Sequence, residues 1–248
     1  MVYHYSNWLS GGKHIVSLLP KIGIYGVSIF YILSGLTLYY VYNSRLSFNL
    51  KDLSTFFLKR FFRNFPLLWL AIFATLLLNW KFPDWDILLL NLSGFFGVIK
   101  IDQYLATGAW SIGNELVFYL FLPFFVLLAQ KSKTLLYIIS IITFAVYCYF
   151  AFYLLDKNIP LIQQWVTYIN PLNQLFLFLG GFLIGHFFSS AKVSTTVNSL
   201  LLISATLVFT FYPIGTDNIT IVTGANRLIF TALCLIICFS FYNLTTFS

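Results

Sequence analysis

The chain of 248 residues is 60% hydrophobic and 21% aromatic, and only 8% of its residues are charged. Soluble domains carry about 25% charged residues, so this composition excludes a soluble globular enzyme and a disordered chain. The net charge of +7 does not indicate a nucleic-acid partner, because the 14 basic residues are spread between apolar runs and form no stripe. We therefore expect one integral membrane domain over residues 1–248.

The apolar runs are continuous and about twice as long as the roughly 10-residue alternating strands of a membrane barrel. Backbone amides in hydrocarbon must be satisfied internally, so these runs predict helices. The expected fold is all-α, a polytopic transmembrane helical bundle of about 7–8 spans. The predicted spans are 22–44, 64–80, 109–130, 134–155, 171–188, 193–216 and 228–248.

The stretch 87–99 is apolar but too short to cross a membrane. As a helix it would extend about 20 Å, whereas a bilayer core is about 30 Å thick. We expect a short re-entrant or interfacial helix here. With this assignment the positive-inside rule gives a consistent orientation, because the predicted inner side collects eight basic residues against Asp52 alone: Arg45, Lys51, Lys59, Arg60, Arg63, Lys131, Lys133 and Lys192.

Ionisable residues inside membrane spans are costly and are therefore candidate functional residues. Glu115 lies in the predicted span 109–130, near its outer mouth, and could orient a base, bind a cation or hold a neighbouring helix. Ser111 and Asn114 share part of its helix face. With Trp110 at the start of this span, they are candidate substrate-binding residues.

His4 precedes the first predicted outer loop, where an imidazole that titrates near neutrality could deprotonate a hydroxyl. It could equally be an interfacial residue.

Arg60 and Arg63 belong to a basic loop that we expect to open a helix at residue 64, with Pro66 in the first turn. Arginines at a helix start suit phosphate binding, although inner loops also collect them for topology. No metal site is expected, because the three histidines share no ligand spacing.

Taken together, these segments resemble the membrane acyltransferase-3 family, whose bacterial members acylate, most often O-acetylate, surface polysaccharides such as the O-antigen of lipopolysaccharide. The matching segments, in order, are His4, the glycine-bearing helix 26–35, the arginine-rich segment 57–69, the segment 110–119 with Trp110, Ser111 and Glu115, and the glycine-bearing helix 178–185.

The resemblance implies an O-acyltransferase of the bacterial inner membrane with several spans. Acyl-CoA would be the donor substrate, no cofactor would be bound, and a carbohydrate or glycolipid hydroxyl would be the acceptor. His4 would be the general base, Glu115 would orient it or the acceptor, and Arg60 with Arg63 would bind the donor phosphates. The predicted topology separates these residues vertically, with His4 and Glu115 toward the outer side and the arginines toward the inner side.

Two departures from the family pattern bear on activity. Family members have about ten spans and a basic residue one helix length before the histidine, so we expect a chain truncated at both ends. Asn64 also stands where the family usually carries an aliphatic residue. Two alternatives therefore stay open, a transporter of a small solute or lipid-linked sugar and an inactive acyltransferase fragment.

Overall fold

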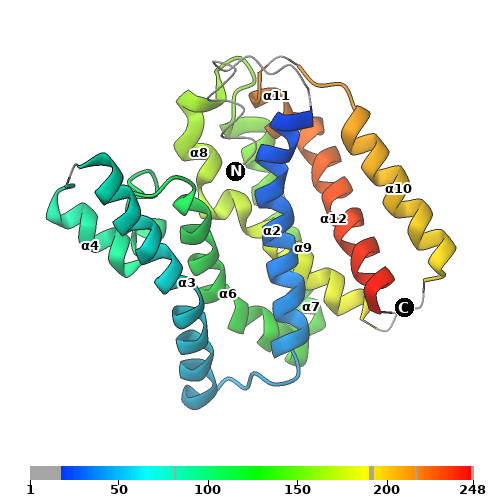
Figure 1. The fold of residues 1–248 in the computed structure, drawn as a ribbon. Helices are drawn as coiled ribbons and strands as arrows, with labels where there is room; N and C mark the ends of the chain where they lie inside the picture. The colour runs from blue at the N-terminus through cyan, green and yellow to red at the C-terminus, as the bar shows by residue number, and fades with distance from the viewer. Residues whose placement is uncertain (1–17, 81, 190–192, 216, 247–248) are drawn as a thin grey trace.

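The computed structural model describes residues 18–80, 82–189, 193–215 and 217–246. Within these ranges the regular elements are all helical (Figure 1). In chain order they are α2 (Leu18–Tyr42), α3 (Leu50–Asn79), α4 (Trp85–Ser93), α5 (Phe96–Ile99), α6 (Ala109–Lys131), α7 (Lys133–Tyr149), the π-helical turn η1 (Phe150–Leu154), the 3₁₀ turn η2 (Leu161–Gln164), α8 (Trp165–Ile169), α9 (Pro171–Phe188), α10 (Thr195–Phe211), α11 (Ile219–Val222) and α12 (Gly224–Thr246).

Six helical segments in the described ranges are long and apolar enough to cross a membrane. They correspond to six of the seven predicted spans. The prediction of a multi-pass helical bundle is therefore confirmed, whereas the predicted number of 7–8 spans is not. The seventh, predicted over 193–216, is the apolar helix α10 of only 17 residues, shorter than the roughly 20 residues that a ~30 Å core requires. The six are Leu18–Tyr42, Leu50–Asn79, Ala109–Lys131, Lys133–Leu154, Pro171–Phe188 and Gly224–Leu244.

The start of α3 corrects the predicted basic loop. The helix begins at Leu50, where the Asn49 side chain accepts a hydrogen bond from the Asp52 backbone amide at 2.8 Å. Pro66 therefore lies inside the helix and not in its first turn. The prediction failed because charged residues end an apolar run without ending a helix, since Lys and Arg are good helix formers.

The stretch 87–99 forms α4 and α5, two short helices that lie beside α3 and α6. Gly94 separates them with a φ of 76°, a left-handed conformation that favours glycine. Neither helix is long enough to cross a membrane. The prediction that this stretch is too short to cross is confirmed, and its re-entrant or interfacial position stays a prediction.

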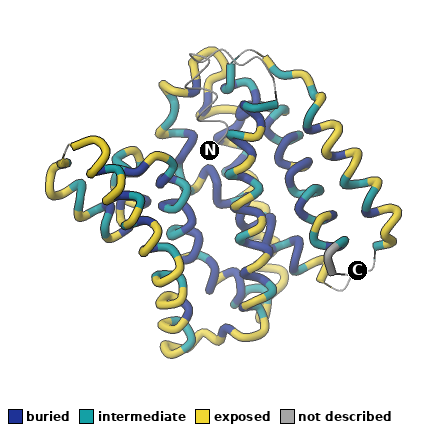
Figure 2. Tube along the Cα trace, viewed as in Figure 1, coloured by how far each residue is buried: buried dark blue, intermediate teal, exposed yellow. Residues whose placement is uncertain are grey.

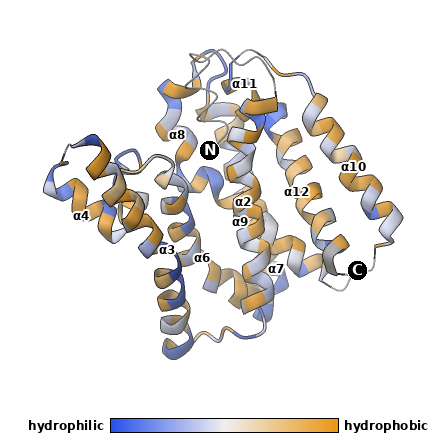
Figure 3. Ribbon diagram, viewed as in Figure 1, coloured by the Kyte–Doolittle hydropathy of each residue, from blue (hydrophilic) through white to orange (hydrophobic). Residues whose placement is uncertain are grey.

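The most buried helices, α2, α6 and α9, lie at the centre of the bundle, whereas α3 and α10 are exposed along much of their length (Figure 2). The exposed faces of the outer helices are largely apolar, as a surrounding hydrocarbon requires (Figure 3).

At the centre, α2 and α9 pack backbone to backbone. A Cβ on Gly35 would collide with the Phe178 carbonyl, and one on Gly181 would collide with the Ile32 carbonyl. Small residues allow this close approach.

A buried lysine ties the start of α2 to the end of α10. The Lys21 ammonium donates hydrogen bonds to three backbone carbonyls, those of Phe209 at 3.2 Å, Thr210 at 2.8 Å and Tyr212 at 2.7 Å. Carbonyls in the last turn of a helix lack intrahelical partners and carry partial negative charge. Lys21 therefore satisfies the C-terminal end of α10 inside the protein.

Candidate functional site

Glu115 is nearly buried on α6 and is held by hydroxyl groups from two helices. Its Oε1 accepts a hydrogen bond from Ser34 Oγ of α2 at 2.7 Å and one from the Tyr119 hydroxyl, one turn further along α6, at 2.5 Å. The Asn64 amide of α3 donates to the Tyr119 hydroxyl at 3.4 Å. Three helices thus fix the position of this carboxylate, while Oε2 accepts no hydrogen bond from the described residues.

Arg60 lies against aromatic rings where α3 faces α2 and α6. Its guanidinium carbon is 5.5 Å from the ring centroid of Tyr42, 5.7 Å from that of Tyr119 and 6.0 Å from that of Phe56. Its Nη2 donates to the Tyr42 hydroxyl at 3.2 Å, and its buried Nε has no hydrogen-bond partner in the part of the chain that the structure describes. These cation–π contacts hold the guanidinium without neutralising its charge.

Arg63 is exposed on α3, one turn beyond Arg60. It makes no hydrogen bond or ion pair with the part of the chain that the structure describes, where the single salt bridge joins Lys100 and Asp86. Its five N–H donors are free to bind a ligand.

Arg60, Arg63 and Glu115 line one pocket of about 180 Å³, which we call the polar pocket; the other lining residues are Phe30, Leu33, Ser34, Thr37 and Leu38. This contradicts the predicted vertical separation of Glu115 from the arginines. Ser34, which binds Glu115, is about 24 Å along α2 from Leu18 but only about 12 Å from Tyr42. The carboxylate therefore lies closer to the Tyr42 end of α2 than to its Leu18 end. Because α3 begins at Leu50, Arg60 and Arg63 lie within this helix and reach the same pocket.

Trp110 and Ser111 line a different cavity of about 370 Å³, which we call the aromatic pocket. Trp110 meets Trp165 edge-on at a centroid distance of 5.5 Å, and the Trp165 indole N–H donates to the Tyr104 hydroxyl at 2.9 Å. Ser111 Oγ donates to the Gly108 carbonyl. The remaining lining residues are Gly23, Ile24, Val27, Thr107, Leu161, Ile162, Tyr168 and Asn218.

Asn114 lines neither pocket. It is buried, and its amide donates to the Ile169 carbonyl at 3.0 Å. That carbonyl lies at the break between α8 and α9, where Asn173 and Gln174 donate to the Tyr168 carbonyl at 2.7 and 2.8 Å. Asn114 therefore anchors α8, which carries Trp165 and Tyr168 into the aromatic pocket.

The remaining predicted site residue, His4, lies outside the described residues, so its role stays a prediction. Conversely, sequence reasoning did not assign a role to Ser34 or Tyr119, the two residues that bind Glu115. Tyr119 carried a usable signal, because residues four apart on a helix are neighbours. Ser34 carried none, because its contact with Glu115 joins two helices distant in sequence. Among the described residues no cluster of histidine, cysteine or carboxylate side chains could hold a metal ion.

The apolar helices and their buried polar side chains define a multi-pass membrane protein. A family model described as an acyltransferase domain, acyltransferase-3, matches residues 1–246. Because this match covers almost the whole chain, the chain belongs to the acyltransferase-3 family and is a membrane acyltransferase in its general class. Searches of curated proteins and of solved structures found no match to the chain.

Proposed function

We propose that the protein is an O-acyltransferase of a bacterial inner membrane. It transfers an acyl group, in the simplest case acetyl, from acyl-CoA to a hydroxyl of a carbohydrate or of a cell-surface polysaccharide precursor. The family supports acyl transfer, and the single observation that carries the donor assignment is the polar pocket with Arg60, Arg63 and Glu115.

The charge of the polar pocket favours an anionic ligand. Two guanidinium groups face one carboxylate, and Arg63 has no intramolecular partner among the described residues. Guanidinium groups bind phosphate through paired N–H donors in a fixed planar geometry. We assign the donor phosphates to Arg60 and Arg63. Glu115 and its hydroxyl partners bound the polar pocket beside them.

The aromatic pocket is the candidate acceptor site. The two pockets follow one another along α2, whose residues Gly23, Ile24 and Val27 line the aromatic pocket and whose segment 30–38 lines the polar pocket. From residue 38 to residue 27 the helix rises about 16 Å. A donor bound by its phosphates would extend its flexible arm between α2 and α6, toward an acceptor held near Trp110 and Ser111.

In the proposed reaction His4 removes the proton of the acceptor hydroxyl as general base. The hydroxyl oxygen forms a bond to the thioester carbonyl carbon, and the carbon–sulfur bond breaks. The coenzyme A thiolate leaves and takes up the proton from the imidazole. Glu115 orients the imidazole or the acceptor in this proposal.

Binding of radiolabelled acetyl-CoA to protein in phosphatidylcholine nanodiscs tests the donor assignment. Arg63→Ala should weaken binding by about tenfold, equivalent to about 1.4 kcal/mol, and should leave thermal stability unchanged because Arg63 has no partner among the described residues. Lys59→Ala is the matched control, since Lys59 is an exposed cation of the same helix outside the pocket. Equal affinity in the parent and Arg63→Ala proteins contradicts the assignment.

Transfer of label from acetyl-CoA to surface glycan in cells tests the catalytic role separately. His4→Ala should bind the donor with unchanged affinity and should lose transfer. A transporter would show little change on this substitution. Retained glycan acetylation in His4→Ala contradicts the catalytic assignment without touching the donor site.

A further inference from the structure

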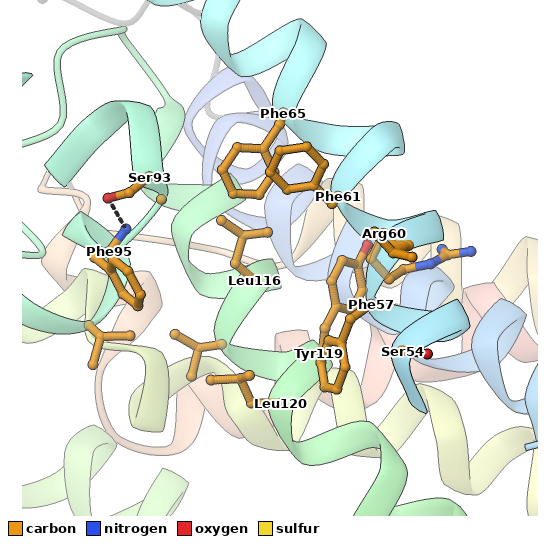
Figure 4. A pocket seen from close by; sticks show the side chains of 14 residues that line it. Ser54, Phe57, Arg60, Phe61, Phe65, Ser93, Phe95, Leu116, Tyr119 and Leu120 are labelled. Carbon is orange, nitrogen blue, oxygen red and sulfur yellow. Dashed lines mark hydrogen bonds between the residues drawn. The ribbon is translucent and has the colours of Figure 1, made fainter. Parts of the chain in front are cut away.

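A second cavity that adjoins the polar pocket at Arg60 has a different chemistry. It is a groove of about 560 Å³ between α3, the α4–α5 junction and α6, which we call the apolar groove (Figure 4). Figure 4 shows Phe57, Phe61 and Phe65 of α3 opposite Leu116 and Leu120 of α6, with the Arg60 guanidinium turned away from this space. The other lining residues are Ser54, Leu58, Arg60, Ser93, Gly94, Phe95, Val98, Val117 and Tyr119.

The polar atoms at the ends of the apolar groove are already satisfied. Ser54 Oγ donates to the Lys51 carbonyl at 2.9 Å, and Ser93 Oγ donates to the Leu89 carbonyl at 2.7 Å. Of the other polar lining residues, Arg60 also lines the polar pocket and the Tyr119 hydroxyl donates to Glu115, so the rest of the groove presents hydrocarbon. Its lining predicts an alkyl chain as the occupant.

The length and depth of the apolar groove fit one leaflet of a bilayer. Along α3 it extends from Ser54 to Phe65, about 16 Å, and half of a ~30 Å bilayer core is about 15 Å. Ser54 lies one turn into α3, near the bundle end that carries Arg45, Lys51, Lys131 and Lys133 against Asp52. A chain that enters at Ser54 would have its headgroup among these cations, which attract an anionic lipid.

The apolar groove also lies on the seam between two parts of the protein. One hydrophobic core contains residues of α2, α6, α9 and α12, whereas a second, smaller core joins α3 to Phe96, Ala106 and Ala109. Beside the groove, Gly97 of α5 touches the Gly113 backbone of α6, and Asn64 of α3 reaches Tyr119. The groove lies between these contacts and is bordered by α3, α5 and α6.

We propose that the apolar groove holds one acyl chain of an anionic phospholipid from the adjoining leaflet. The acyl chain fills the apolar groove and fixes α3, which carries Arg60 and Arg63, against α6, which carries Glu115. The lipid thereby sets the geometry of the polar pocket. The binding site itself is independent of the proposed acyl-transfer activity.

Photo-crosslinking in phosphatidylcholine vesicles that contain a small fraction of phosphatidylglycerol with a diazirine-bearing acyl chain tests the proposal. Crosslinks should concentrate in peptides that contain residues 54–65, 93–98 and 116–120. Leu120→Trp fills the groove and should abolish these crosslinks. Leu207→Trp on α10 is the matched control, because both leucines are 52% exposed and only Leu120 lines the groove. Val98→Trp is a second filling variant, should Leu120→Trp fail to give monodisperse protein.

Three outcomes overturn the proposal. Even labelling of all exposed helices means that only the general lipid annulus was detected. Equal labelling by a phosphatidylcholine probe of the same chain contradicts selection of an anionic headgroup. Competition by palmitoyl-CoA but not by unlabelled phosphatidylglycerol makes the acyl chain of a donor the occupant. Each of these outcomes can be distinguished from loss of donor binding at Arg63, which uses a separate assay.

Discussion

The Tyr119 hydroxyl donates a hydrogen bond of 2.5 Å to Glu115 Oε1, and the same hydroxyl accepts one from Asn64. Tyr119 therefore connects the carboxylate on α6 to the helix that carries both arginines. Leaving a buried hydrogen-bonding group without its partner costs about 1–3 kcal/mol. The orientation of Glu115 thus depends on a neighbour one turn away on its own helix.

Removing this hydroxyl should reduce activity more than stability. We expect Tyr119→Phe to lower the rate of acetyl transfer by about tenfold or more, since about 1.4 kcal/mol corresponds to a factor of ten. The ring stays in place and keeps its contact with Arg60. Tyr149→Phe is the control, because Tyr149 is 52% exposed on α7 and lies outside the described pockets. Parent-like transfer by Tyr119→Phe would mean that the orientation of Glu115 is irrelevant to the reaction.

Lys21 should contribute strongly to stability through its three carbonyl partners. Lys21→Met keeps the length of the side chain but leaves the end of α10 unsatisfied, and we expect a loss of about 3 kcal/mol. Thermal unfolding in detergent measures this loss. Lys51→Met, at an exposed position in the first turn of α3, should change the stability by less than about 0.5 kcal/mol. Equal melting temperatures for the two variants would refute the capping role.

Two glycines of α2 provide a matched pair for the packing of α2 on α9. Gly35→Ala introduces a methyl group into the Phe178 backbone and should destabilise the protein by about 1–3 kcal/mol, the usual range for overpacking. Gly26→Ala meets no atom within 4 Å and should be tolerated. The retention of monomeric protein after heating, measured by size-exclusion chromatography, compares the two. Similar behaviour of both variants would contradict backbone contact between these helices.

The Asp86–Lys100 pair gives a pH dependence outside the predicted spans. The hydrogen bond from Lys100, at 3.1 Å, lowers the pKa of the exposed Asp86 carboxyl below its ordinary value. Because the folded pKa is depressed, the contribution of the pair is fully present above the ordinary carboxyl pKa and is lost as the pH falls through the folded value. Lys100→Met should raise the Asp86 pKa, which a carboxyl ¹³C NMR titration measures. An unchanged titration would show that the pair does not form.

Sequence reasoning predicted most of the helices and the residue types of the site, but it placed two features wrongly. The basic residues before position 64 led to a predicted helix start at that residue. In the structure α3 begins at Leu50, where Asn49 caps it. The same error, combined with the idea that Glu115 lies at the outer mouth, separated groups that line one pocket. Both errors arise because an apolar run indicates only which residues can contact lipid. A helix continues beyond such a run wherever its backbone hydrogen bonds can form.

The long apolar runs are enough to predict a multi-pass helical bundle, because hydrocarbon admits apolar helices whose length can be counted along the chain. The sequence also carried the motifs of the family. The folded arrangement of the helices was needed to show that Ser34 and Tyr119 hold Glu115, that Arg60 and Arg63 share its pocket, and that Asn114 anchors α8. Apart from Tyr119, which lies one turn from Glu115 on α6, these residues are tens of positions apart in the sequence. Their contacts depend on how helices rotate and approach one another, which hydropathy does not specify.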